Sequence, residues 1–153
     1  MSGRHSFSIT QCLAALLMMA LPMSCSAALG ENESTIAAEQ AQMNATRRVT
    51  RTDTHAVHEM QTPAGHVIRE YVSPTGTVFG IAWQGPSKPD LKQLLGSHFN
   101  ELQPAQRTAI RRGPAVINQP GLVLEMSGHM RAFAGRAYLP QLLPAGVQAE
   151  AIR

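Results

Sequence analysis

Histidines and acids are the side chains of this sequence with the most chemistry to offer. Beyond residue 28 the chain has five histidines, at His55, His58, His66, His98 and His129. No two of them stand at the i, i+4 spacing by which a helix presents two imidazoles to one zinc ion. A metal or catalytic site therefore has to be assembled across the fold, and the residues that we consider for it are His66, His129 and Glu70.

The sequence lacks the usual motifs of several enzyme classes. Ser127-Gly128-His129 is not a nucleophile elbow, and neither a phosphate-binding P-loop nor a GxGxxG turn occurs. Glu59 and Glu70 can flank a cleft, as glycosidase carboxylates do, although arginines are available to pair with them. The pattern favours a binding protein over an enzyme. The alternative is a small enzyme or metal-binding protein that uses His66, His129 and Glu70.

Aromatic residues gather in the stretch REYVSPTGTVFGIAWQG, Arg69 to Gly85, which holds the only tryptophan. Strand alternation predicts Phe79 and Trp83 on one face and Tyr71 on the other, so the three rings do not form one stacking platform. We expect Phe79 and Trp83 in the core, with the indole edge of Trp83 at a strand end. The candidate ligand-binding residues are Trp83, His66, Tyr71 and Glu70; we expect no cofactor and no metal.

The first 28 residues have the order of a secretory signal peptide. Arg4 precedes an uncharged run, CLAALLMMALPM, that is too short to span a bilayer comfortably, and Ser26-Ala27-Ala28 fits a cleavage site. Cleavage after Ala28 removes both cysteines, Cys12 and Cys25, so the mature chain has no disulfide. Lipidation of Cys25 is not favoured, because Pro22 stands where a lipobox has leucine. We expect a periplasmic or secreted protein, with membrane contact only during export.

Residues 29–53 contain few large apolar side chains, and we predict that they form a flexible N-terminal arm. The basic cluster Arg47, Arg48 and Arg51 lies here without interleaved aromatics. Removing residues 1–28 removes only Arg4 from 13 Lys and Arg side chains, against 10 Asp and Glu. This balance does not indicate a nucleic-acid partner.

Residues 54–153 are predicted to form a single α+β domain. Three β-rich runs, divided by TPAG and SPTG, indicate an antiparallel meander. Four-residue loops would align Glu59, Ile68 and Ile81 in one row and Val57, Glu70 and Phe79 in another. The buried face would then carry Ile68, Val72, Phe79, Ile81 and Trp83, with His58 on the opposite face.

A helix follows, because apolar residues recur at helical spacing from Leu91 to Leu102, after Asp90 and before Pro104. Gly96 weakens this helix. Two further strands, at residues 122–127 and 129–138, form a C-terminal hairpin, and the small residues of the second indicate close packing. The expected fold is an antiparallel β-sheet of about five strands, meander plus hairpin, packed with one main amphipathic helix.

Two segments, REYVSPTGTVFGIAWQGPSKPDLKQLLGSHF and GHMRAFAGRAYLPQLLPAGV, carry a family resemblance. They resemble a family of exported proteins from Gram-negative bacteria, catalogued as a domain of unknown function (family 2844). The resemblance implies a small single domain outside the cytoplasm. It implies no catalytic residues, because the family has no established activity. The expectation is a non-enzymatic binding protein of the cell envelope with a protein partner or an envelope component, or one that assists export or assembly of another protein.

Overall fold

The computed structural model describes residues 29–153, and their main feature is one seven-stranded antiparallel sheet. The predicted signal peptide and Cys25 lie outside the described residues. The strand order is β1-β2-β3-β4-β7-β6-β5. The strands are β1 (Thr46–Arg51), β2 (Ala56–Gln61), β3 (Val67–Val72), β4 (Val78–Gly85), β5 (Ala115–Gln119), β6 (Leu122–His129) and β7 (Ala132–Tyr138).

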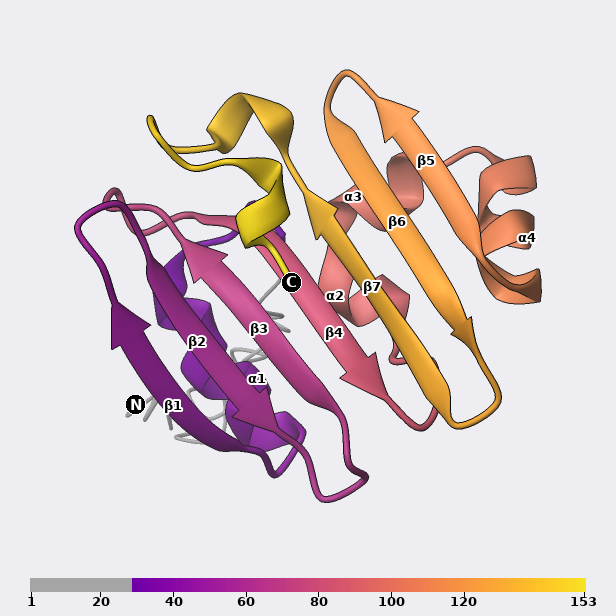
Figure 1. Cartoon of the computed structure of the whole chain (residues 1–153), viewed down its shortest axis with the longest axis horizontal. Coiled ribbons are helices and arrows are strands. Elements are labelled where there is room, and N and C mark those ends of the chain that lie inside the picture. Colours follow the sequence, from indigo (N-terminus) through magenta and orange to yellow (C-terminus); the bar gives the residue numbers. More distant parts are fainter. Residues whose placement is uncertain (1–28) are drawn as a thin grey trace, which may run out of the picture.

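Two meanders, β1 to β4 and β5 to β7, join through the pairing of β4 with β7 (Figure 1). Short helices cover one face of the sheet, and the C-terminal segment crosses the other face near one end of β4 and β7. The helices are η2 (Glu33–Thr35), α1 (Ile36–Gln42), α2 (Leu91–Leu95), α3 (Ser97–Glu101), α4 (Pro104–Arg112), η3 (Pro140–Leu142) and η4 (Ala149–Ala151). The α+β class is confirmed, whereas five strands and one main helix are both wrong. No helix of residues 29–153 is long and apolar enough to cross a membrane.

The segment expected to be a flexible arm, residues 29–53, differs most from its prediction. Leu29 is buried and its N–H donates to the Leu94 carbonyl at 3.0 Å, and Ile36 of α1 is fully buried. The arginines of the basic cluster, expected in this flexible arm, lie instead in β1, which pairs with β2. The buried side chains of Leu29 and Ile36 are enough to hold this segment against the domain. β1 itself needs no buried side chains, because its main chain pairs with β2 at the edge of the sheet.

Both turns of the first meander contain five residues rather than four. Gly65 and Gly76 have φ values of 84° and 82°, the left-handed conformation that glycine adopts without steric cost. The longer loops shift the register by one residue, so Glu59 pairs with Arg69 and not with Ile68. The predicted rows are therefore wrong. In the structure His58, Glu70 and Ile81 form one row, which brings His58 onto the face of Glu70.

A β-bulge in β4 corrects the prediction for Phe79. Tyr71 pairs with Gly80 and Val72 pairs with Val78, so Phe79 is an extra residue. Its ring turns to the face away from the helices, where it lies 6.2 Å from the ring of Tyr71. Val78 takes its place in the main core beside Val72. Ile68, Val72, Ile81 and Trp83 share the helix-covered face, as predicted.

The predicted helix from Leu91 to Leu102 is broken at Gly96, whose φ of 53° and ψ of −128° no helix continues. The carboxylate of Asp90 caps α2 by accepting hydrogen bonds from the N–H groups of Lys92 and Gln93. Leu91, Leu94, Leu95 and Leu102 still reach the core, so the apolar stripe indicated the buried side chains but not the continuity of the helix.

The small residues of β7 make room for Trp83. A Cβ atom at Gly135 would lie 2.4 Å from Cζ2 of Trp83 and 2.8 Å from the Glu125 carbonyl oxygen. The indole therefore packs directly against Gly135 of β7, and Trp83 is only 3% exposed. This contact links the two meanders at their junction.

We predict that Gly135→Ala destabilises the protein by about 1–3 kcal/mol, because the added methyl group overpacks a rigid ring and a main-chain oxygen. Urea unfolding of both proteins measures the difference. The matched control is Gly121→Ala, since no atom lies within 4 Å of a Cβ atom at Gly121. Equal stability of the Gly135→Ala variant and the parent protein would show that the indole moves freely.

Candidate functional site

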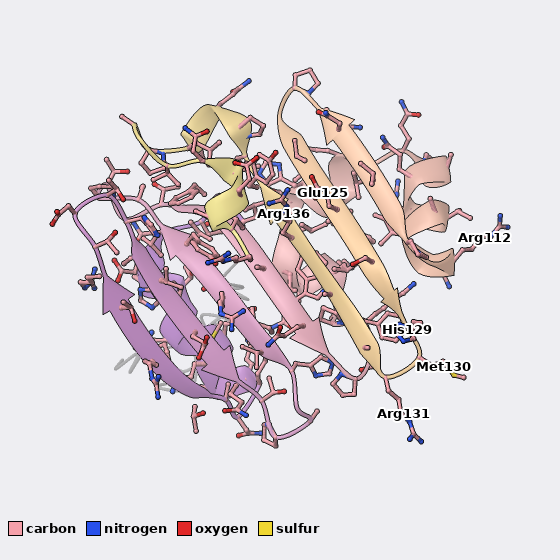
Figure 2. The ribbon with its side chains drawn as sticks, viewed as in Figure 1. Arg112, Glu125, His129, Met130, Arg131 and Arg136 are labelled. Carbon is pink, nitrogen blue, oxygen red and sulfur yellow. The ribbon has the colours of Figure 1, made fainter. Side chains whose placement is uncertain are left out.

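The structure places the predicted site residues in separate environments. Trp83 and Glu70 are buried on the helix-covered face, whereas Tyr71 packs on the opposite face. Nε2 of His66 lies 3.0 Å from the Ser87 hydroxyl, and His129 ends β6 at an exposed turn (Figure 2). Residues 29–153 contain no group of three His, Cys, Asp or Glu side chains able to hold a metal ion. His66, His129 and Glu70 are not brought together.

Two buried carboxyl groups form an acidic pair under α1. Glu39 of α1 and Glu70 of β3 both have no exposed surface, and as carboxylates neither has a hydrogen-bond donor within reach among residues 29–153. Burial, together with the adjacent Glu70, raises the pKa of Glu39 to about 10. Burial also raises the pKa of Glu70, to about 7, although a hydrogen bond from Glu39 and the charge of Arg47 oppose this. The Glu39 carboxyl group is therefore protonated at neutral pH and donates to Glu70.

His58 extends this polar group toward the sheet edge. Its Nε2 lies 2.9 Å from the Glu33 carboxylate, which also accepts a 2.8 Å hydrogen bond from Arg51. Burial lowers the pKa of His58, and the charge of Glu33 partly opposes this. Burial acts to raise the pKa of Glu33, but Arg51 and His58 together hold it below its usual value. The contacts of Glu33 with His58 and Arg51 join η2 to the sheet. The carboxyl groups of Glu39 and Glu70 remain buried, so neither is exposed to a substrate.

The opposite face of the sheet carries a row of paired residues that runs through six strands, from β2 to β5, and contains two ion pairs. The Glu59–Arg69 pair has a nitrogen–oxygen distance of 2.7 Å, and Arg136 contacts both oxygens of Glu125 at 3.0 and 3.2 Å. Ala82 separates the two arginines in the row, and Val116 ends it on β5. Ala82 is buried in a hydrophobic cluster with Val147 and Ile152, so the C-terminal segment covers the centre of the row.

The C-terminal segment is fastened over one half of this face. The Tyr71 hydroxyl donates to the main-chain oxygen of Arg153 at 2.9 Å and accepts from its N–H at 3.0 Å. Nη1 of Arg136 donates to the Ala149 carbonyl at 2.9 Å. The side chain of Ile152 packs onto Gly80, where a Cβ atom would lie 2.8 Å from it. Tyr71 and Arg136 thus hold the C-terminal segment in place over one half of this face, and the other half is left uncovered.

A groove of about 510 Å³ lies between this segment and β5, on the open half. We call it the open groove; the side chains and main chain around it belong to Arg69, Trp83, Gln84, Val116, Glu125, Met126, Ser127, Ala134, Gly135, Arg136, Ile152 and Arg153. A second hollow of about 610 Å³ shares Gln84 and Ala134 with it. Figure 2 shows Glu125 of β6 and Arg136 of β7 side by side.

Sequence reasoning named Trp83 in this region but missed the residues that shape the groove. Arg69 lies in one row with Glu125 and Arg136 only because two distant hairpins pair through β4 and β7. Their alternation along each strand is visible in the sequence, but the row depends on the register between strands. Glu39 was missed because the segment around it was expected to be unstructured.

We predict that the Glu39–Glu70 pair makes the protein less stable as pH rises. An acid whose folded pKa exceeds its unfolded value stabilises the fold below the unfolded pKa, and the contribution is lost as pH rises toward the folded pKa. From pH 7 to pH 9, above the titration of His58, the free energy of unfolding should fall by on the order of 2 kcal/mol. Glu39→Gln should abolish most of this fall, because an amide stays neutral.

Urea unfolding at several pH values measures this slope, with the exposed Glu31 changed to Gln as the matched control. An identical fall of stability in the Glu39→Gln variant and the parent protein would contradict a proton held by this pair.

Comparisons with known proteins give one family. The curated proteins and the solved structures with which the chain was compared gave no match. A family model described as "Protein of unknown function (DUF2844)" matches residues 25–152, which include the whole sheet, both acidic residues of the buried pair and every residue of the open groove except Arg153. This coverage confirms the resemblance carried by the two quoted segments, and the chain belongs to the DUF2844 family.

Proposed function

We propose that this protein is an exported binding protein that holds an elongated, anionic amphiphile in the open groove and acts by binding rather than by catalysis. The observation that carries the proposal is the incomplete covering of one sheet face. The C-terminal segment protects only part of it, and the remainder is hollowed to about 510 Å³. Small-molecule sites occupy roughly 300–1,000 Å³.

The charge of the open groove favours an anion. Three arginines line it, against Glu125 as the single acid, and Glu125 is already paired with Arg136. Arg69 uses Nε and Nη1 in hydrogen bonds, so its Nη2 group has no hydrogen-bond partner among residues 29–153. Arg153 also lines this groove, and its main-chain oxygen accepts the hydrogen bond from Nη1 of Arg69. Together these groups form a place for one carboxylate or phosphate group.

The rest of the lining favours an apolar body. Val116 is 75% exposed, an unusual state for a large aliphatic side chain, and the exposed Ala134 continues the apolar surface. The second hollow extends this surface past Ala132 and Phe133. An elongated chain attached to an anionic group fits both the length and the chemistry of the surface.

Features of the sequence support export. Residues 1–28 have the order of a signal peptide, and the chain beyond them has no cysteine. Leu29, the first residue after the proposed cleavage site, is fully buried in the domain. A periplasmic or secreted location in a Gram-negative bacterium is therefore part of the proposal.

Mass spectrometry of the protein recovered from the cell envelope should find Leu29 as its first residue, and an unprocessed chain would contradict export by cleavage.

The alternative, an enzyme or metal site of His66, His129 and Glu70, receives no support from the geometry. Glu70 is buried under α1, His66 is engaged with Ser87, and His129 lies at the turn between β6 and β7.

We predict that dodecanoate, below its critical micelle concentration, binds the purified protein and changes the fluorescence of Trp83. This is the only tryptophan; its main chain lies at the floor of the open groove, and its indole packs against Gly135, another residue of the groove, from the helix-covered face. Dodecyltrimethylammonium should bind at least tenfold more weakly, because its charge is opposed by Arg69 and Arg153. Val116→Asp should weaken dodecanoate binding about tenfold, since it replaces an apolar contact with a like charge.

The matched control is Met130→Asp, because Met130 is 88% exposed and points away from the sheet at the turn between β6 and β7 (Figure 2). Its affinity for dodecanoate should equal that of the parent protein. Equal binding of the anionic and cationic amphiphiles, or equal weakening by both substitutions, would contradict a specific site in the open groove.

A further inference from the structure

The outer edge of β1 is a second surface, separate from the open groove at the far side of the sheet. Strand β1 pairs with β2 alone among residues 29–153, and all six of its residues are exposed. It has no proline and no bulge, the features that commonly interrupt an edge. Figure 1 shows it as the last strand on the left of the sheet.

The ladder shows which main-chain groups are free. Thr52 N–H donates to the His55 carbonyl at 2.8 Å, in the same register as the β1–β2 pairs. Hydrogen-bonded and non-bonded pairs alternate in an antiparallel ladder. Thr46, Arg48 and Thr50 therefore direct their N–H and C=O groups to β2. Those of Arg47, Val49 and Arg51 point outward.

The side chains of these same residues define one face of the edge. Arg47, Val49 and Arg51 lie on the helix-covered side, opposite Met60, His58 and Ala56. Val49 is 41% exposed, and the three side chains border a hollow of about 460 Å³ between β1 and the η2–α1 segment. Ala37 and Gly76 contribute to its wall. A row of free main-chain groups beside a side-chain hollow is what strand addition requires.

The positive charge of β1 indicates which kind of segment can bind along its edge. It carries three arginines and no acid, and within residues 29–153 only Arg51 of the three has an ion-pair partner, Glu33. An antiparallel pairing of β1 with a second copy would bring arginine rows together, which like-charge repulsion opposes. An acidic segment would instead be attracted.

We propose that the outer edge of β1 binds an extended acidic segment of another protein by β-strand addition. The segment has acidic side chains that face Arg47 and Arg51 and an apolar side chain between them that faces Val49. Its pattern is acidic–x–apolar–x–acidic, because alternate residues of a strand share a face. The bound segment becomes an eighth strand next to β1.

The direct test is amide hydrogen exchange with a blocked synthetic peptide, Thr-Glu-Thr-Val-Thr-Glu-Thr. In the free protein the amides of Arg47, Val49 and Arg51 should exchange quickly, and those of Arg48 and Thr50 slowly. Saturation with the peptide should slow the three outward amides at least tenfold. The same peptide with lysine in place of glutamate should not protect them.

Two substitutions locate the contact. Val49→Pro removes an outward N–H and no bond to β2, so it should abolish peptide binding while the protein stays folded. Arg47→Glu should weaken the glutamate peptide at least tenfold and create affinity for the lysine peptide. Arg48→Glu is the matched control, because its side chain lies on the other face of β1, and it should weaken the glutamate peptide less. If Val49→Pro does not fold, the comparison of Arg47→Glu with Arg48→Glu still shows whether the peptide binds along the outer edge of β1.

Three results would overturn the proposal. They are no binding of the glutamate peptide at millimolar concentration, equal binding by Val49→Pro, and protection of these amides by self-association of the protein. The last result would identify a second copy as the occupant. Dodecanoate binding to Val49→Pro separates this surface from the open groove, since the groove should keep its affinity.

Discussion

The pairing of β4 with β7 is the constraint on which the rest of the structure depends. It joins the two meanders, and its register sets Trp83 opposite Gly135 and Gly80 opposite Tyr138. Each glycine accepts a large side chain on a different face: the indole of Trp83 on the helix-covered face and Ile152 on the other. Larger residues at these positions would separate the strands from the layers above and below them. The pairing of β4 with β7 thus determines how side chains pack on both faces of the sheet.

The two faces of the sheet are filled to different extents. Helices α1 and α2 cover one face so completely that even Glu39 and Glu70 are removed from water. A carboxyl pair in this position persists by keeping a proton, because two adjacent buried charges would repel one another without solvent. The other face is covered only where Tyr71, Phe79 and the C-terminal segment meet. The difference in coverage produces the open groove.

Much of the local structure could be predicted from the sequence. Strand alternation placed Ile68, Ile81 and Trp83 on the buried face, the Pro and Gly residues marked both turns of the first meander, and Asp90 marked the start of a helix. The bulge at Phe79 and the one-residue shift of Glu59 could not be predicted. Both depend on how the chain closes a loop, and a single added residue reverses which face a side chain occupies. β1 and β5 were missed for a related reason: edge strands have no continuous apolar pattern.

The sequence by itself determined the α+β class, the family and the types of residue in each strand, because these follow from local periodicity and composition. Only the tertiary structure decided that Arg69, Arg136 and Glu125 form one row, that Glu39 meets Glu70, and that an arginine-rich stretch is an edge strand. These residues are far apart in the chain. Their contacts exist only when the register of β3, β4 and β7 is set by side chains packed on both faces of the sheet, a cooperative property that no local pattern contains.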